Sequence, residues 1–342
     1  MALAASLSLK GPTHRSRLKP EHATNQPHHR QYCLALASLT LSLLVGSADI
    51  APSQVWYHLV TNDGSVADQI IDQLRLPRSL SAFAVGGVLA LAGALMQVLL
   101  RNPLADPYIL GISGGAASAV LLGMLISLPA YWITPLAFTG AMSSLIIVFA
   151  LGYQSQTHNT DRLLLTGIVV AAGWSALISL VLSLGPPMRL PGMLYWLMGD
   201  LSDALSPSIG LTILMLGLAA AIRLAPQLNL AVYGMQQAAL LGVNPQRLRY
   251  QLYFLASLLT AAAVSIAGAI GFIGLIVPHI VRIAGARDHR VLLPVAVLIG
   301  GSLLMLADTL ARTIISPMQI PVGVLTAVIG VPVFLWLLHR RA

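Results

Sequence analysis

Helix-length apolar stretches recur along almost the whole chain, and they constrain its fold more than any other feature. A helix needs about 20 mostly apolar residues to cross a hydrocarbon core of about 30 Å. Of the 342 residues, 57% are hydrophobic and only 9% are charged, whereas soluble domains carry about 25% charged residues. We therefore predict an all-α polytopic transmembrane protein with about ten spans per protomer, although nine also fit. The candidate stretches are 32–45, 80–100, 109–128, 135–153, 163–184, 209–225, 252–270, 272–283, 291–311 and 322–338.

Basic residues divide unevenly between alternate loops. If ten spans follow a cytoplasmic N-terminus, only Arg75, Arg78, Arg189 and Arg312 of the 19 Lys and Arg residues fall on the outer side. Cytoplasmic loops carry the excess of Lys and Arg, so we predict that both termini are cytoplasmic. The net charge of +8 then mostly reflects this asymmetry. We expect membrane lipid as a partner and no nucleic acid.

Residues 1–30 differ in composition from the rest of the chain. They are polar and basic, and they hold no apolar region long enough for a cleaved signal peptide. We interpret them as a disordered cytoplasmic tail or the product of an over-called start codon; a transit segment is the less favoured alternative. We predict one transmembrane permease domain at 31–342, with its longest cytoplasmic loop at 226–250. A single cysteine, Cys33, excludes an intrachain disulfide and a four-cysteine metal site.

The chain has no motif of its own for converting energy. No GxxxxGK[ST] phosphate loop is present, so a primary transporter of this sequence requires ATP binding in a separate subunit. The spans also lack the buried acid or histidine relays of proton-driven carriers, since Asp308 and Arg312 lie near an outer span end and His279 and Arg282 near an inner one. This disfavours the alternative of an ion- or proton-coupled secondary transporter. An intramembrane enzyme is a weaker alternative because no HExxH or GxSxG motif occurs. We expect no catalytic residues.

Three blocks carry a resemblance to a known family. They are LRLPRSLSAFAVGGVLALAGALMQVLLRNPLADPYILGISGGA (74–116), AVSIAGAIGFIGLIVPHIVRIAGARDHRVLLP (263–294), and LLMLADTLAR with PVGVLTAVIGVPVFLWLL (303–338). The chain resembles the FecCD-like permease subunits of bacterial ABC importers for iron-siderophore, haem and cobalamin uptake. The resemblance implies a homodimer in the inner membrane, two ATP-binding subunits and a periplasmic substrate-binding protein. It implies no cofactor on this chain, because ATP is used by the partner subunit.

The inner loop between the sixth and seventh spans is the segment that docks onto the ATPase subunit in this family. The matching residues here are Gln237, Ala238, Ala239 and Gly242. Gln237 stands where the family pattern often has an acid, so charge pairing at that position is in doubt. The alternative is a plain amphipathic loop.

The family's outer arginines receive carboxylates from the binding protein, and the matching residues here are Arg75, Arg78 and Arg312. Arginine suits this role because its planar fork binds a carboxylate through two parallel hydrogen bonds. The alternative is that these side chains snorkel to lipid headgroups.

By resemblance, the start of the third span, the fifth span and the segment after it line the translocation path. The candidates are Ser113, Gly114, Thr166, Ser175, Met193 and Trp196. Core packing is the alternative for the glycine, and an interfacial aromatic belt is the alternative for the segment after the fifth span. Asp200 stands where siderophore members often carry a small hydroxyl residue. The histidines lack zinc-site spacing, so we expect no metal ligation, and the chelate carried is left open.

Overall fold

A computed structural model describes residues 26–46, 50–58, 61, 64–152, 160–202 and 207–339. Every regular element among these residues is helical. The elements are α1 (Gln26–Leu44), α2 (Pro52–His58), α3 (Val66–Gln69), the π-helical η1 (Ile70–Arg75), α4 (Leu76–Leu99), the 3₁₀ helix η2 (Pro107–Leu110), α5 (Ile112–Leu125), the 3₁₀ helix η3 (Ala130–Trp132), α6 (Ile133–Gly152), α7 (Thr160–Leu184), α8 (Leu190–Leu197), α9 (Pro207–Ala231), α10 (Met235–Leu240), α11 (Pro245–Ala267), α12 (Ile273–Ile283), α13 (His289–Thr313) and α14 (Val322–His339).

Each of the ten stretches predicted to span the membrane coincides with one of these helices. Among the described residues, six helices are long and apolar enough to cross a bilayer. Four more are apolar but shorter, at Gln31–Leu44, Ile112–Leu125, Ile273–Ile283 and Val322–Leu337. The all-α membrane class is therefore confirmed, whereas the count of about ten spans stays a prediction.

Two expected boundaries differ from the structure. Helix α1 begins at Gln26, so the last residues of the expected tail at 1–30 are helical; residues 1–25 lie outside the described residues. The expected loop at 226–250 is shorter, because α9 continues through Pro226 to Ala231 and α11 begins at Pro245. A proline in the first turn of a helix loses no hydrogen bond, and Asn244 caps α11 by accepting from the Arg247 N–H at 3.0 Å.

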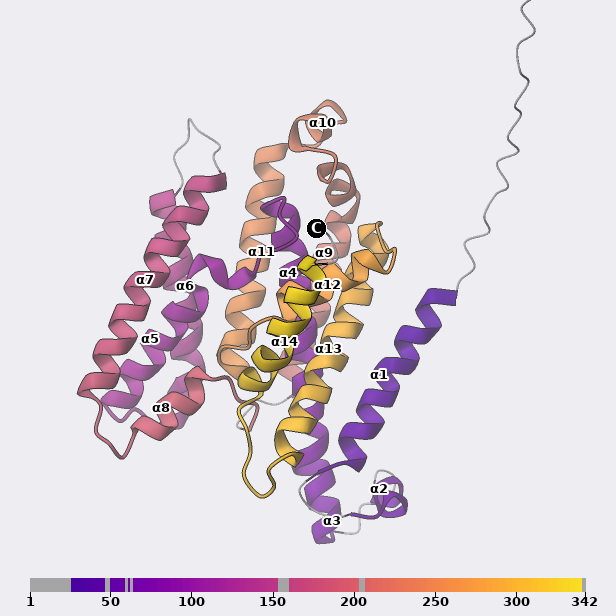
Figure 1. Cartoon of the computed structure of the whole chain (residues 1–342), viewed down its shortest axis with the longest axis vertical. Helices are drawn as coiled ribbons and strands as arrows, with labels where there is room; N and C mark the ends of the chain where they lie inside the picture. Colours follow the sequence, from indigo (N-terminus) through magenta and orange to yellow (C-terminus); the bar gives the residue numbers. More distant parts are fainter. Residues whose placement is uncertain are drawn as a thin grey trace, which may run out of the picture.

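Helix α4 lies at the centre of the molecule. Figure 1 shows α5, α6 and α7 side by side, next to a larger group in which α4 packs against α9, α11, α12 and α13, with α1 along α13. Helix α10 lies at one end of the molecule and α3 at the other (Figure 1), and we call these the α10 end and the α3 end. In the apolar 18-residue window of Val66–Leu99, which contains α4, 94% of the residues are buried, whereas only 11% are buried in the corresponding window of α7.

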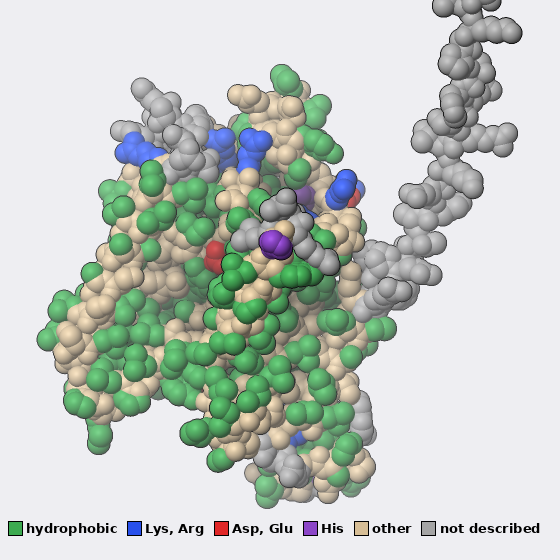
Figure 2. Space-filling model, in the orientation of Figure 1, with side chains coloured by type: hydrophobic (Ala, Val, Ile, Leu, Met, Phe, Trp, Pro, Cys, Tyr) green, Lys and Arg blue, Asp and Glu red, His purple; other side chains and the backbone are tan. Residues whose placement is uncertain are grey.

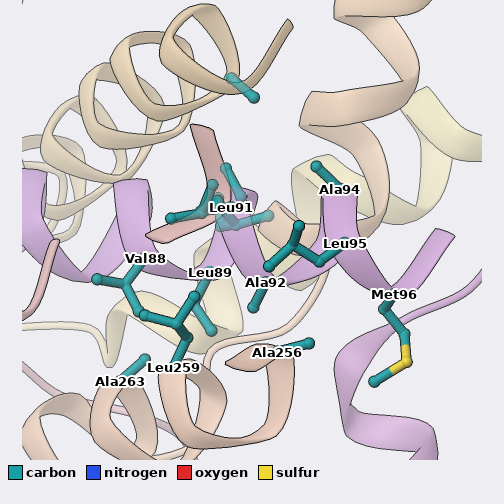
Figure 3. Packing of buried hydrophobic residues seen from close by; sticks show 14 of the residues in the cluster. Val88, Leu89, Leu91, Ala92, Ala94, Leu95, Met96, Ala256, Leu259 and Ala263 are labelled. Atoms are coloured by element: carbon teal, nitrogen blue, oxygen red, sulfur yellow. The ribbon is translucent and has the colours of Figure 1, made fainter. Parts of the chain in front are cut away.

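Large side chains of α4 pack against α11. Figure 3 shows Val88 and Leu89 of α4 beside Leu259 and Ala263 of α11, at the heart of the hydrophobic core. Because lipid supplies little hydrophobic driving force between helices, close van der Waals contact holds them together. Val88, Leu89, Leu259 and Ala263 supply this contact between α4 and α11.

Glycines let α4 touch two further helices backbone to backbone. A Cβ on Gly86 would overlap the carbonyl oxygen of Gly300 in α13, and a Cβ on Gly93 would overlap the backbone of Gly274 in α12. Small residues at such crossings are the usual device of membrane helices. The two contacts fix the register of α4 against α13 and α12.

Gly93→Ala places a methyl group where the backbone of Gly274 already lies. Backbone atoms yield only if α12 shifts, and overpacking of this kind costs about 1–3 kcal/mol. We expect a lower midpoint of thermal unfolding for the purified variant in detergent.

Gly173→Ala in α7 is the control, because no atom lies within 4 Å of its added Cβ. Both variants gain the same helix propensity, about 1 kcal/mol, so the difference between them isolates packing. Equal midpoints for the two variants would contradict the close approach of α4 and α12.

Candidate functional site

An arginine and an aspartate pair at the α3 end. The Nε of Arg78 in α4 lies 3.0 Å from both carboxylate oxygens of Asp308 in α13, and its Nη2 lies 2.8 Å from Oδ1. The pair follows from the helix register. Arg78 precedes Gly86 by eight residues and Asp308 follows Gly300 by eight, which is about 12 Å along each helix from the contact between the two glycines.

Arg78 reaches the surface with its remaining nitrogen. Its Nη1 donates to the Oε1 of Gln319 at 2.9 Å and to the Oγ of Ser202 at 3.3 Å. Its Nη2 lies 3.9 Å from the Oδ1 of Asp200, and 13% of its side chain is exposed. One side of the guanidinium therefore faces the interior and the other faces solvent.

Asp308 is shared with a second arginine. The Nε of Arg312 lies 3.2 Å from Asp308 Oδ2, and the exposed fractions of these two side chains are 8% and 1%. The Nη2 of Arg312 donates to the Oγ of Ser42 in α1 at 3.1 Å and to the Oγ1 of Thr309 at 3.4 Å. One buried carboxylate thus balances parts of two guanidinium groups, as buried charge requires.

The third arginine fastens the end of α1. The hydroxyls of Ser42 and Ser79 are 2.6 Å apart, and Ser79 donates to the backbone oxygen of Arg75 at 2.7 Å. The Nη1 of Arg75 donates to the carbonyl of Leu43 at 2.7 Å, where a helix end leaves carbonyls without partners. A Cβ at Gly46 would lie 2.6 Å from Nη2 of Arg75, so glycine there makes room for the guanidinium.

The structure brings the three sequence-predicted arginines to one end of the molecule but not to one surface. Arg75 and Arg312 are buried, at 3% and 7% exposure, so neither presents its guanidinium at the surface of this chain, and their docking role stays a prediction. Carbonyl, hydroxyl and carboxylate partners inside the protein hold them there. Arg78 remains as the arginine that meets solvent.

The α10 end carries a short helix between two glycines with positive φ, Gly234 at 123° and Gly242 at 87°. After α10 the Val243 N–H donates to the Ala238 carbonyl and the Gly242 N–H to the Ala239 carbonyl, both at 3.0 Å. This pattern ends a helix in a left-handed residue, which glycine adopts at little cost. Gly242 thereby turns the chain from α10 towards α11.

Helix α10 presents most of its predicted residues to solvent. Gln237, Ala239 and Gly242 are exposed, while Ala238 is buried in the main core. Sequence reasoning missed Leu240, Leu241 and Tyr233, which are 89%, 67% and 74% exposed. The sequence signal that could have indicated these residues is the presence of large apolar side chains in a connection between two helices. Arginine side chains gather at the same end (Figure 2).

The predicted path residues are spread over three helices. Ser113 at the start of α5 and Thr166 in α7 are half-buried, and Ser175 in α7 is exposed. The hydroxyls of Thr166 and Ser175 donate to carbonyls one turn earlier in their own helix, at 2.8 and 3.0 Å. Trp196 in α8 is half-buried against the core. Nothing in the structure brings these four residues into one site.

Two further path candidates have packing roles. A Cβ on Gly114 would lie 2.8 Å from the Cβ of Trp174, so α5 approaches α7 closely there. The indole of Trp174 donates to Ser144 of α6 at 3.0 Å. Met193 of α8 is fully buried with Leu121 of α5 and Val181 of α7, so it lines no surface in this structure and packs α8 against those two helices.

An irregular connection between α4 and α5 holds a polar pair that sequence reasoning missed. Asp106 is half-buried, its Oδ1 accepts from the Tyr108 N–H at 2.8 Å, and burial raises the pKa of its carboxyl to about 6. The Tyr108 hydroxyl accepts from the Ile270 N–H at 3.2 Å, where α11 has ended and α12 has not begun. Backbone groups between interrupted helices need such partners when they are buried.

Among the residues that the structure describes, no three His, Cys, Asp or Glu side chains form a group able to hold a metal ion.

Comparison with known proteins gives consistent matches. Residues 34–340 match the FecCD transport family. The haemin transport system permease protein HmuU of Yersinia pestis is 39% identical over 323 residues, covering 90% of this chain and 94% of that protein. The cobalamin import system permease protein BtuC of Halobacterium salinarum is 43% identical over 279 residues, covering 80% and 74%.

A solved structure supports the same assignment. It is described as an inward-facing conformation of a metal-chelate type ABC transporter, and it superposes with a TM-score of 0.79 at 30% sequence identity. The match covers 91% of this chain and 98% of that one. Because the family match extends over nearly all of the helical region, the chain belongs to the FecCD transport family.

Proposed function

We propose that this chain is the membrane-spanning permease subunit of an ATP-driven importer that passes a chelated metal compound into the cytoplasm. The observation that carries the proposal is the family match over residues 34–340. The named relatives transport haemin and cobalamin, so the cargo class is a ferric siderophore, haem or cobalamin. The comparisons give no support to the alternative of a secondary transporter.

Energy enters through other subunits in this proposal. The sequence has no phosphate loop, so two ATP-binding subunits serve a homodimer of this chain, and a periplasmic binding protein delivers the cargo. Closure of the ATP-binding subunits shifts the permease between outward-open and inward-open packings. The weakly buried α7 offers apolar surface for a second copy or for lipid, with the path between two copies and about ten spans in each.

The two ends of the molecule take different roles. The α10 end is cytoplasmic, since arginines gather there and cytoplasmic loops carry the basic excess. There, Gln237, Ala238, Ala239 and Gly242 form the coupling segment, and the exposed Leu240 and Leu241 fill a groove on the ATPase subunit. The α3 end is periplasmic and receives the binding protein.

At the α3 end we assign the docking contact to Arg78 and supporting roles to Arg75 and Arg312. Arg78 is exposed on one side, and its fork suits a carboxylate of the binding protein. Arg75 and Arg312 hold α1 and α13 around it. Ser113, Gly114, Thr166, Ser175 and Trp196 remain candidates for the path; Met193 packs α8 against α5 and α7.

Hydrolysis of ATP tests the proposal directly. The purified chain alone is expected to show no ATPase activity, because it lacks a phosphate-binding loop. Addition of its ATP-binding subunits should produce hydrolysis that the binding protein stimulates. Hydrolysis by the chain alone, at a rate unaffected by those subunits, would sink the assignment.

Leu240→Ser tests the coupling surface. Loss of a leucine from a packed interface costs about 2–5 kcal/mol, so we expect much weaker copurification with the ATP-binding subunits. Val66→Ser at the opposite end is the matched control, because Val66 is also an exposed apolar residue, at 75%. If both variants copurify as well as the unsubstituted chain, α10 is not the coupling element.

A further inference from the structure

We propose that Asp308 is a positioning residue for the docking of the binding protein, a role that rests on the docking function proposed for Arg78. Its buried carboxylate holds Arg78 at the surface in the orientation that a partner carboxylate meets. Through Arg312 and Ser42 the same carboxylate ties that orientation to the end of α1. Asp308 itself touches no partner, since its side chain is 1% exposed.

The first support is the division of the Arg78 guanidinium. Asp308 occupies Nε and one side of Nη2 through three contacts of 2.8 to 3.0 Å, and these contacts fix the plane of the group. The solvent side keeps Nη1, whose partners Gln319 and Ser202 are neutral. A neutral partner is displaced by a carboxylate more easily than a charged one, because charge-assisted hydrogen bonds are roughly twice as strong.

The second support is the loose contact between Arg78 and Asp200. The Oδ1 of Asp200 lies 3.9 Å from the Nη2 of Arg78, which is too far for a hydrogen bond. A carboxylate of the partner can therefore approach the solvent side of Arg78 more closely than Asp200 does. One carboxylate oxygen of Asp200 already has other partners, because its Oδ1 accepts from the N–H and the hydroxyl of Ser202 at 3.1 and 2.8 Å.

The third support is that docking leaves no buried charge without a partner. When a partner carboxylate draws Arg78 outward, Asp308 keeps Arg312 at 3.2 Å. Breaking a buried pair by removing one partner is strongly destabilising, and the shared arrangement avoids that loss. Arg312 in turn remains bonded to Ser42, so the end of α1 stays connected to Asp308.

A double-mutant cycle on the assembled permease and ATPase complex tests the proposal. The affinity of the purified binding protein is measured for the unsubstituted complex, Arg78→Gln, Asp308→Asn and the double variant. We expect each single variant to bind on the order of tenfold more weakly, equivalent to about 1.4 kcal/mol. The double variant should bind no more weakly than Arg78→Gln, because Asp308 acts through Arg78.

Arg189→Gln is the matched control at the same end of the molecule. Its Nη1 donates to the carbonyls of Met124 and Leu125 at 3.0 and 2.8 Å, away from the Asp308 cluster, so its loss should leave the affinity unchanged.

The outcomes separate the two claims. If Arg78→Gln binds as the unsubstituted complex does, the docking role of Arg78 fails. If Arg78→Gln binds weakly but the losses of the two single variants multiply in the double variant, Asp308 contributes only to general stability and the positioning role is overturned. Tighter binding by Asp308→Asn would overturn it too, because Asp308 would then compete with the partner.

A second pair of variants tests the proposal if the Asp308→Asn chain does not assemble with the ATP-binding subunits. Arg312→Gln is compared with Arg312→Gln/Asp308→Asn, which carries no charge at either position of α13. The added Asp308→Asn change should again weaken docking on the order of tenfold. Equal affinities for these two variants would overturn the proposal.

Discussion

The contact between Gly86 of α4 and Gly300 of α13 is the constraint on which the rest of the structure depends. Without side chains at the crossing, the two backbones touch and the helices cannot slide without overlap. Two turns towards the α3 end, the fixed register sets Arg78 opposite Asp308. Packing in the core thus determines which charged side chains meet at the α3 end.

The opposite ends of the molecule then carry different chemistry on one rigid centre. The α10 end exposes two leucines between two glycine turns and a tyrosine just before the first, a surface suited to another protein's apolar groove. The network of Arg75, Arg78 and Arg312 at the α3 end keeps its charges mostly inside and exposes part of the Arg78 guanidinium. Helix α4 joins the two ends, and the interrupted connections around Tyr108 and Ile270 lie where η2 and α12 contact that central helix.

The helices were predictable from the sequence because each depends on a local apolar run, and all ten stretches proved helical. The length of the loop at 226–250 was not, because Pro226 reads as a helix end while the surrounding core keeps α9 continuous. Burial of Arg75 and Arg312 was not predictable either. It depends on Ser42 and Leu43, which lie far from these arginines in the chain, and on Asp308, whose i,i+4 spacing to Arg312 indicates a pair but not its burial. Met193 shows the same limit, since only the packing of α8 against α5 and α7 decides that it is buried.

Transport with defined sidedness tests the central claim most directly. The complex of this chain with its ATP-binding subunits is inserted into lipid vesicles, and the α3 end is labelled to sort vesicles by orientation. The account predicts cargo accumulation only when the binding protein is on the side of the α3 end and ATP is on the side of the α10 end. Accumulation with the two components exchanged, or driven by an ion gradient without ATP, would contradict it.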